Sequence, residues 1–326
     1  MMPAAATRKV LLTGATGFVG RAAESKLVSA GWQVRSLTRQ MGRARPSSPG
    51  VEWAQGDVAS AADSGRALEG VQAALYLVHG MGEGKDFARR EIEEAGRFAD
   101  AAARAGVRRI VYLGGVAPAG GASPHLSSRL AVGDTLRAGP VPTIELRASM
   151  IIGHGSLSWL IVRDLAARLP LMVLPSWLRS RTEPVGIDDV VAALVGALEL
   201  PEGDHGCFDL PGPDVLSGRE ILDETARQMQ LDPPFVVEVP VLTPRLSSHW
   251  VRFVTRAQWA VAREVVVGLT HDLLARDDLF WRRIGHPRRL SFAEAACRAL
   301  AAEGPTPGTW GAIERLLKRR RPRAHA

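Results

Sequence analysis

Residues Val10–Gly20 read VLLTGATGFVG, an apolar run that leads directly into a turn with three glycines. Gly14, Gly17 and Gly20 leave room for another molecule to approach the backbone, and a helical pattern follows over 17–30. Backbone amides at the N-terminus of such a helix can bind a diphosphate when no side chain stands in between. A strand, a glycine-rich turn and a helix in this order therefore predict a dinucleotide-binding loop.

Strands and helices alternate through the first half of the chain. Six apolar runs predict strands at 9–13, 33–38, 51–55, 73–78, 109–113 and 143–147. Helical patterns separate them at 17–30, 61–68, 86–105 and 127–138. This order predicts an α/β fold, a doubly wound parallel sheet of the Rossmann type with helices on both faces.

Long helical patterns dominate after Gly153, so we expect a smaller, mainly helical C-terminal lobe. It is expected to interleave with the sheet, because 182–187 has the pattern of a returning strand and 188–200 that of a helix. Apolar helical segments over 250–274 fit a lid or, alternatively, a docking face for a lipid or membrane surface. The predicted units are a Rossmann domain at 1–153, a substrate and lid lobe at 154–317, and a basic tail at 318–326.

The composition is that of a globular protein, with 326 residues, 46% hydrophobic and 23% charged. Much of the net charge of +7 lies near the C-terminus, and without five basic residues there the net charge is +2. These residues are Lys318, Arg319, Arg320, Arg321 and Arg323. We therefore expect no specific nucleic-acid partner, and the tail leaves peripheral contact with an anionic membrane open.

Neither a metal site nor a disulfide framework is expected, because Cys207 and Cys297 lie far apart without metal-ligand spacing. Charged residues interrupt the apolar stretch 159–174, which argues against a transmembrane helix. The first nine residues lack the apolar core of a signal peptide. These observations lead us to expect a cytoplasmic protein.

The end of the second predicted strand bears on the choice of cofactor. A ribose 2′-hydroxyl is usually bound there by an acid, but the sequence has Thr38 and Arg39. A cation suits a 2′-phosphate, so NADP(H) is favoured, while NAD(H) stays possible. The alternative is that Arg39, like Arg43 and Arg45, is a solvated loop charge.

The ends of later strands supply further candidates for cofactor contact. Asp57 and Val58 follow the third strand and are placed to meet an adenine, although Asp57 has the alternative role of capping the next helix. Val78 and His79 end the fourth strand, where a cofactor ribose would pass. His154 follows the sixth strand and either lines a substrate pocket or is a polar loop residue.

The segments 13–20 and 56–58 resemble the extended short-chain dehydrogenase/reductase (SDR) superfamily. Residues 75–79, 108–115 and 183–190 look like its fourth strand, its fifth strand and its late strand-to-helix return. The greatest similarity is to the atypical branch, with the NmrA-like NAD(P)H-binding proteins and the nucleotide-binding accessory subunit of respiratory complex I. The resemblance covers roughly residues 8 to 215.

Active members of that superfamily carry a Tyr-x-x-x-Lys pair whose phenol exchanges a proton during hydride transfer. Neither Tyr76 nor Tyr112 has a lysine four residues later, and Gly114 stands where a serine usually follows the fifth strand. If the next helix begins early enough, His125 and Arg129 share one helix face at the Tyr and Lys positions. The resemblance then implies that Arg129 holds the nicotinamide ribose and that His125 is a candidate acid, the alternative being a ribose or loop hydrogen bond.

Three functions follow from this resemblance. We expect an NADP(H)-dependent oxidoreductase of an apolar carbonyl or quinone-like compound. The competing interpretation is a non-catalytic NAD(P)H sensor or assembly factor, because the Tyr-x-x-x-Lys pair is missing, and a third is a sugar-nucleotide-type epimerase or dehydratase. The predicted cofactor-binding residues are Gly14, Ala15, Thr16, Gly17, Phe18, Val19, Gly20, Thr38, Arg39, Asp57, Val58, Val78, His79 and Arg129.

Overall fold

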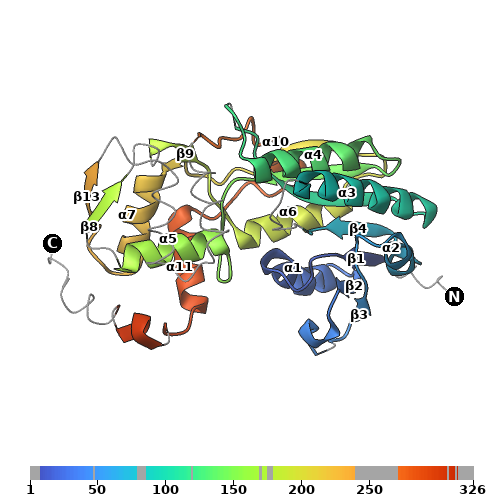
Figure 1. Ribbon diagram of the computed structural model, residues 1–326, viewed down its shortest axis with the longest axis horizontal. Helices are drawn as coiled ribbons and strands as arrows, with labels where there is room; N and C mark the ends of the chain where they lie inside the picture. Colours follow the sequence, from blue (N-terminus) through green and yellow to red (C-terminus); the bar gives the residue numbers. More distant parts are fainter. Residues whose placement is uncertain are drawn as a thin grey trace.

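A computed structural model describes residues 8–46, 48–78, 86–118, 120–168, 171–174, 179–238, 271–306, 308–312 and 314. Figure 1 shows a sheet with covering helices on the right and a smaller, more helical part on the left. Most of the predicted lid segment 250–274 lies outside the described residues. Its last residues are described and are not helical, because Leu273 instead forms a β-bridge with Thr182.

Seven parallel strands form the main sheet in the order β11-β6-β5-β4-β1-β2-β3. These strands are β1 (Lys9–Leu12), β2 (Gln33–Thr38), β3 (Val51–Gln55), β4 (Ala73–Tyr76), β5 (Arg109–Gly115), β6 (Thr143–Ala148) and β11 (Gly206–Asp209). β1 pairs with β2 on one side and with β4 on the other, so the strand order reverses beside it. The predicted doubly wound sheet is confirmed, and the end of β1 lies at the point where such sheets bind ligands.

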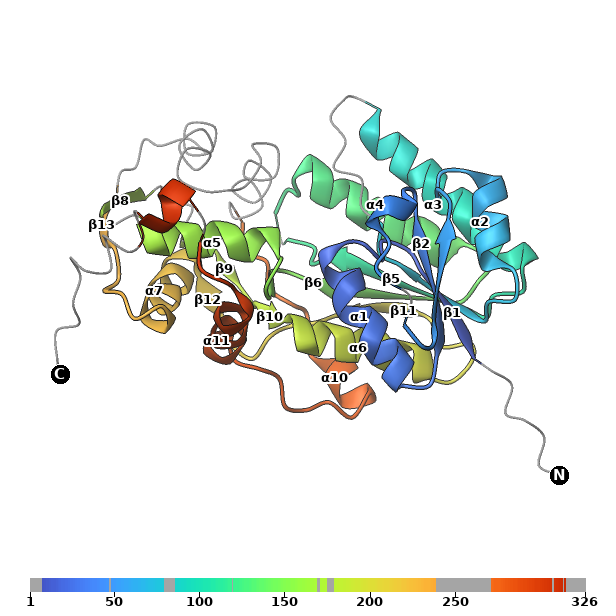
Figure 2. The same cartoon turned by 90° about the horizontal axis from the view of Figure 1, so that it is seen from below.

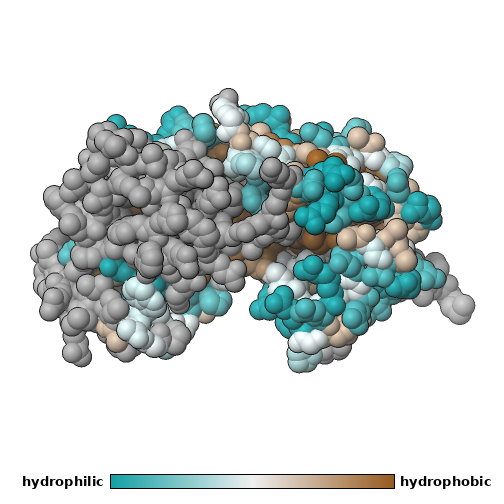
Figure 3. Space-filling model, viewed as in Figure 1, coloured by the Kyte–Doolittle hydropathy of each residue, from teal (hydrophilic) through white to brown (hydrophobic). Residues whose placement is uncertain are grey.

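Both faces of the sheet are buried. Val10 and Leu12 face the cluster that contains α1 (Phe18–Ser29) and α6 (Ile187–Glu199), whereas Leu11 faces the opposite side. The helices on that opposite side are α2 (Ala61–Leu68), α3 (Phe87–Arg104) and α4 (Pro124–Ala138). Figure 3 shows hydrophilic surfaces above and below, with a hydrophobic band between them at the level of the sheet. Burial on both faces explains why the strands read as nearly continuous apolar runs.

The predicted returning strand is wrong. Residues 182–187 add no strand to the main sheet; they contribute to β9 (Arg181–Thr182) and β10 (Val185–Gly186), which pair with short strands elsewhere. Pro184 separates the two strands, and proline has no amide hydrogen to donate to a ladder. The returning strand is instead β11, while the helix predicted after residue 187 is present as α6 and packs against α1.

The second lobe has its own apolar cluster, in which Trp159, Ile221 and Phe292 are fully buried. Its helices are α5 (Leu157–Arg168), α7 (Gly218–Gln228) and α11 (Phe292–Ala302), and its short strands are β7 (Ile151–Ile152), β8 (Leu171–Leu174), β12 (Leu216–Ser217) and β13 (Phe235–Glu238). The short helix α10 (Leu279–Arg283) does not belong to this cluster. Its residues Phe280 and Trp281 pack into the apolar core of the main sheet. The predicted domain boundaries stay a prediction.

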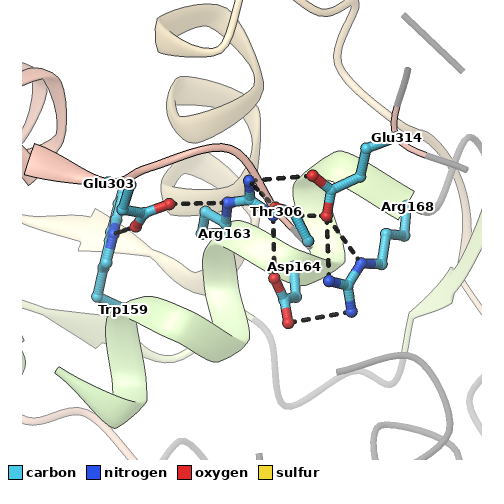
Figure 4. Close-up of polar contacts among 7 residues, drawn as sticks. All are labelled: Trp159, Arg163, Asp164, Arg168, Glu303, Thr306 and Glu314. Atoms are coloured by element: carbon cyan, nitrogen blue, oxygen red, sulfur yellow. Dashed lines mark hydrogen bonds and ion pairs between the residues drawn. The ribbon is translucent and has the colours of Figure 1, made fainter. Parts of the chain in front are cut away.

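A buried network of charges ties α5 to the segment after α11 (Figure 4). Both terminal nitrogens of Arg163 contact the carboxylate of Glu314, at 2.6 and 3.0 Å, and its Nε lies 3.1 Å from Glu303 Oε2. Arg168 Nε donates to Glu314 Oε1 at 3.0 Å. Burial alone would raise the pKa of Glu314, but the hydrogen bonds from Arg163 outweigh it and hold that pKa below its usual range.

Candidate cofactor and active site

The turn after β1 is fixed by Thr13. Its Oγ1 donates to the Leu75 carbonyl at 3.0 Å and accepts from the Leu77 amide at 2.9 Å, which joins the ends of β1 and β4. Gly14 follows with φ +65°, and a Cβ there would lie 2.5 Å from the Leu77 carbonyl oxygen. Only glycine fits at this position, because the conformation and the space both exclude a side chain.

Helix α1 starts against this turn. A Cβ at Gly20 would lie 2.3 Å from the Gly14 carbonyl oxygen, so the helix approaches the turn more closely than an alanine permits. Gly17 caps the helix and is exposed, no side chain caps its amides, and the first turn holds no acid. The positive end of the helix dipole is therefore open beside glycine backbone, which fits the diphosphate of a dinucleotide.

The three arginines near the end of β2 differ in exposure and in their partners. Arg39 is exposed directly after the strand, and Arg43 is exposed in the short 3-10 helix η1 (Met41–Arg43). Arg45 instead pairs with the buried Glu24, at 2.6 Å. Thr38 is buried, with Oγ1 accepting from the Gln40 amide. Arg39 and Arg43 are thus both exposed beyond β2, whereas Arg45 is held by Glu24.

The residues after β3 and β4 have mixed surroundings. Asp57 Oδ1 accepts from the Ala59 amide at 3.1 Å, so the carboxylate orders the turn, while Ser60 caps α2. Val58 is buried in the core, which leaves its backbone for contact with a ligand. Val78 is half-buried against the same core, and the predicted contact at His79 lies outside the described residues.

Helix α4 brings His125 and Arg129 together on one face. Ser123 caps the helix by accepting from the Leu126 amide, so it begins at Pro124, three residues earlier than its sequence pattern predicts. His125 therefore lies in the first turn, one turn before Arg129, and both are half-buried. The His125 ring packs against the ring of Phe87 on α3, with 4.9 Å between the two ring centroids. The helix therefore begins early enough for the two side chains to share a face, while their equivalence to the Tyr and Lys positions stays a prediction.

Both tyrosines are structural. Tyr76 and Tyr112 are 3% and 0% exposed, and burial raises the pKa of both phenols well above the usual range. The Tyr112 hydroxyl donates to the Arg129 carbonyl at 3.0 Å. Neither phenol is thus placed to exchange protons near neutral pH, and Tyr112 instead positions α4.

Glu145 is a feature that sequence reasoning missed. This carboxylate is completely buried on β6, where it accepts from Arg137 Nε at 2.8 Å and Arg147 Nε at 2.7 Å. A Cβ at Gly133 would lie 2.4 Å from Glu145 Oε1, so α4 is pressed against the acid. A charged residue inside a strand was the available signal, but its partners are not deducible from spacing.

The fold and the glycine turn define a dinucleotide-binding Rossmann protein. A family model described as NAD(P)H-binding matches residues 14–166. The (4-alkanoyl-5-oxo-2,5-dihydrofuran-3-yl)methyl phosphate reductase of Streptomyces griseus subsp. griseus is 30% identical over 227 residues, 67% of this chain and 73% of that protein. The ceramide reductase of Caulobacter vibrioides is 30% identical over 200 residues, which are 59% of this chain and 61% of that protein, so the match spans less than two thirds of it.

Solved structures share the fold. The triphenylmethane reductase of Citrobacter sp., complexed with NADP(H), matches with a TM-score of 0.70 and 18% identity over 89% of this chain and 99% of its own. The Bordetella bronchiseptica enzyme WbmH, in complex with NAD+, matches with a TM-score of 0.67 and 17% identity over 90% of this chain and 97% of its own. The chain belongs to the atypical branch of the short-chain dehydrogenase/reductase superfamily and to its NAD(P)H-binding, reductase-like proteins.

The described residues provide neither a metal-binding cluster nor a membrane-spanning helix. No group of three or more histidine, cysteine, aspartate or glutamate side chains is arranged there to hold a metal ion. Within the same part of the chain, no helix has both the length and the hydropathy needed to cross a membrane.

Proposed function

We propose that this chain is an NADPH-dependent reductase of an apolar carbonyl compound. The observation that carries the proposal is the joint arrangement of an open helix N-terminus after β1 and a histidine–arginine pair on α4. Two reductases at 30% identity support it, one named for ceramide and the other for a phosphate ester that bears an alkanoyl group. An acyl-chain ketone or enone is therefore the substrate class to test first.

The bound cofactor would supply a hydride to the substrate carbon, and the protein has to supply a proton to the oxygen. His125 is the proposed donor, because an imidazole is a good proton-transfer group near neutral pH. Arg129, one helical turn away, would hold the nicotinamide ribose hydroxyls. The amides of Phe18 and Val19 and the Gly17 backbone would hold the diphosphate.

NADPH is proposed over NADH because Arg39 and Arg43 are exposed beyond β2. Fluorescence titration of both reduced coenzymes tests this preference. Arg39→Asp is expected to weaken NADPH binding about tenfold or more and NADH binding much less, because it places an acid near the 2′-phosphate. Arg43→Ala removes the second exposed cation beyond β2 and should act in the same direction. Equal losses for both coenzymes in Arg39→Asp would remove the assignment.

Turnover is tested by NADPH oxidation against ketones of increasing acyl-chain length, enones, aldehydes and quinones. His125→Ala is expected to lower kcat about 10²-fold or more with little change in coenzyme binding. His205→Ala is the matched control, since His205 is exposed in the loop before β11. Turnover that is insensitive to His125→Ala would exclude this residue as the acid.

A second candidate function is a non-catalytic NAD(P)H sensor. The burial of both tyrosines favours it, because the phenol that serves active members of the superfamily has no equivalent at an exposed position. Coenzyme binding without turnover of any substrate in the panel would support this alternative.

A further inference from the structure

A cavity of about 630 Å³ lies between the first helix of the Rossmann part and the second lobe. Its walls come from the start of α1, the loop after β7, the start of α6 and one face of α11. Figure 2 shows α11 on one side and the adjacent helices α1 and α6 on the other. Residues from both parts of the chain therefore enclose one space.

The cavity is lined mainly by small residues. Gly17, Gly153 and Gly186 bring three backbone segments to its wall, and Ala295 and Ala299 do the same for α11. Two guanidinium-bearing side chains also line it, Arg21 on α1 and Arg298 on α11. Asp188 lines the cavity as well, paired with Arg298. Close backbone and an excess of one cation still suit a compact anion better than an alkyl chain.

The two helices that start at this cavity differ in their charges. Helix α6 carries two acids in its first turn, and Asp189 is buried while it accepts from the Leu290 amide at 2.9 Å. Helix α1 has neither an acid in its first turn nor a capping side chain. The unmatched positive end at the cavity is thus that of α1, the helix with the dinucleotide-binding turn.

The Arg298 side chain is held at the start of α6 by an exposed ion pair, in the wall of the same cavity. Its Nη1 lies 2.6 Å from Asp188 Oδ2, with 62% of the Arg298 side chain and 51% of the Asp188 side chain exposed. Ion pairs with this much exposure contribute little, so the guanidinium can exchange Asp188 for a phosphate oxygen at low cost. Arg21 lies one turn into α1, and helical side chains lean toward the N-terminus, which directs Arg21 to the same end.

We propose that Arg298, together with Arg21, binds the diphosphate of the dinucleotide, so that the second lobe contributes a cofactor contact of its own. This inference rests on dinucleotide binding at the glycine turn but not on turnover. The proposed reacting residues His125 and Arg129 do not line the cavity, which separates this contact from the carbonyl end of a substrate. The bound diphosphate would then be held by residues from both parts of the chain.

Calorimetry with matched ligands tests the proposal on the full chain. Arg298→Ala is expected to weaken NADPH and ADP-ribose, which both contain the diphosphate, about tenfold. Adenosine 2′-monophosphate, which lacks it, is expected to bind unchanged in competition titrations. Arg288→Ala is the control, because Arg288 is 89% exposed on the same lobe and does not line the cavity.

Three results would overturn the inference. Equal weakening of ligands with and without the diphosphate would indicate a structural role, and no weakening of either would exclude a contact. A loss of inorganic phosphate binding with unchanged NADPH affinity would indicate a separate anion site. If the wild-type protein bound neither NADPH nor NADH, the cofactor assignment itself would fail, which is distinguishable from a failure of Arg298 alone.

Discussion

The hydroxyl of Tyr112 on β5 donates a hydrogen bond to the backbone carbonyl of Arg129 on α4, at 3.0 Å. The bond spans 17 residues and fixes the second turn of the helix against the sheet. In most active relatives a tyrosine belongs to the chemistry, whereas here a tyrosine holds the helix that presents the candidate residues.

Tyr112→Phe removes this bond and leaves the ring in place. We expect the free energy of unfolding to fall by about 0.5–1.5 kcal/mol in urea denaturation, the usual contribution of one hydrogen bond. The pH dependence of turnover is expected to keep its shape, because the phenol does not titrate near neutral pH. A pH profile that lost a limb in Tyr112→Phe would show that this phenol takes part in proton transfer.

Alkaline stability follows from the two buried phenols. Their pKa values are raised in the folded protein, while in the unfolded chain a tyrosine pKa is about 10. Above that pH the unfolded chain releases protons that the folded protein retains, so the free energy of unfolding decreases as the pH rises. Urea denaturation at pH 9 to 11 measures this decrease, and the double variant Tyr76→Phe/Tyr112→Phe should show a smaller one. An identical decrease in both proteins would contradict the assignment.

The two cysteines are expected to differ in reactivity. Burial, and then the charge of Glu145, raises the pKa of the Cys207 thiol to about 11, whereas Cys297 is exposed. At pH 8 only about one Cys207 in a thousand is a thiolate, the form that reacts with alkylating agents. Peptide mass spectrometry after brief iodoacetamide treatment should find Cys297 modified at least about tenfold faster. Glu145→Gln should accelerate Cys207, and comparable rates in the wild-type protein would refute the expected burial.

Replacing glycine by alanine is expected to have opposite effects on stability at two helix positions. Gly133→Ala places a Cβ 2.4 Å from the buried Glu145 carboxylate, so we expect destabilisation by about 1–3 kcal/mol. Gly96→Ala on α3 would meet only Thr135 Cγ2, at an ordinary 3.7 Å, and should stabilise by up to about 1 kcal/mol through helix propensity. Thermal unfolding of both variants measures the difference, and similar shifts would mean that Glu145 yields to the added methyl group.

The parts of the fold that sequence predicted are those governed by local pattern. The six predicted strands all match within two residues at each end, because continuous apolar runs reflect burial on both faces; they begin at Lys9, Gln33, Val51, Ala73, Arg109 and Thr143. β11 was missed because Gly206–Asp209 is short and ends in an acid, and only pairing with β6 makes it a strand. The Tyr112–Arg129 hydrogen bond and the Arg298–Asp188 ion pair were missed for a related reason, since each joins residues that are distant in sequence.

The buried charge network of the second lobe is expected to stabilise the protein strongly. Arg163 is 6% exposed and pairs with Glu314 through two nitrogens and with Glu303 through a third. Arg163→Ala leaves both carboxylates with one fewer partner in a buried position, which typically costs about 3–5 kcal/mol. Urea denaturation should show this loss, and limited proteolysis should cut near Glu303 sooner, because the segment after α11 loses its anchor. Arg108→Ala is the control, since its pair with Glu202 is largely exposed and should contribute no more than about 1 kcal/mol. Equal losses in the two variants would mean that the buried network stabilises no better than a surface pair.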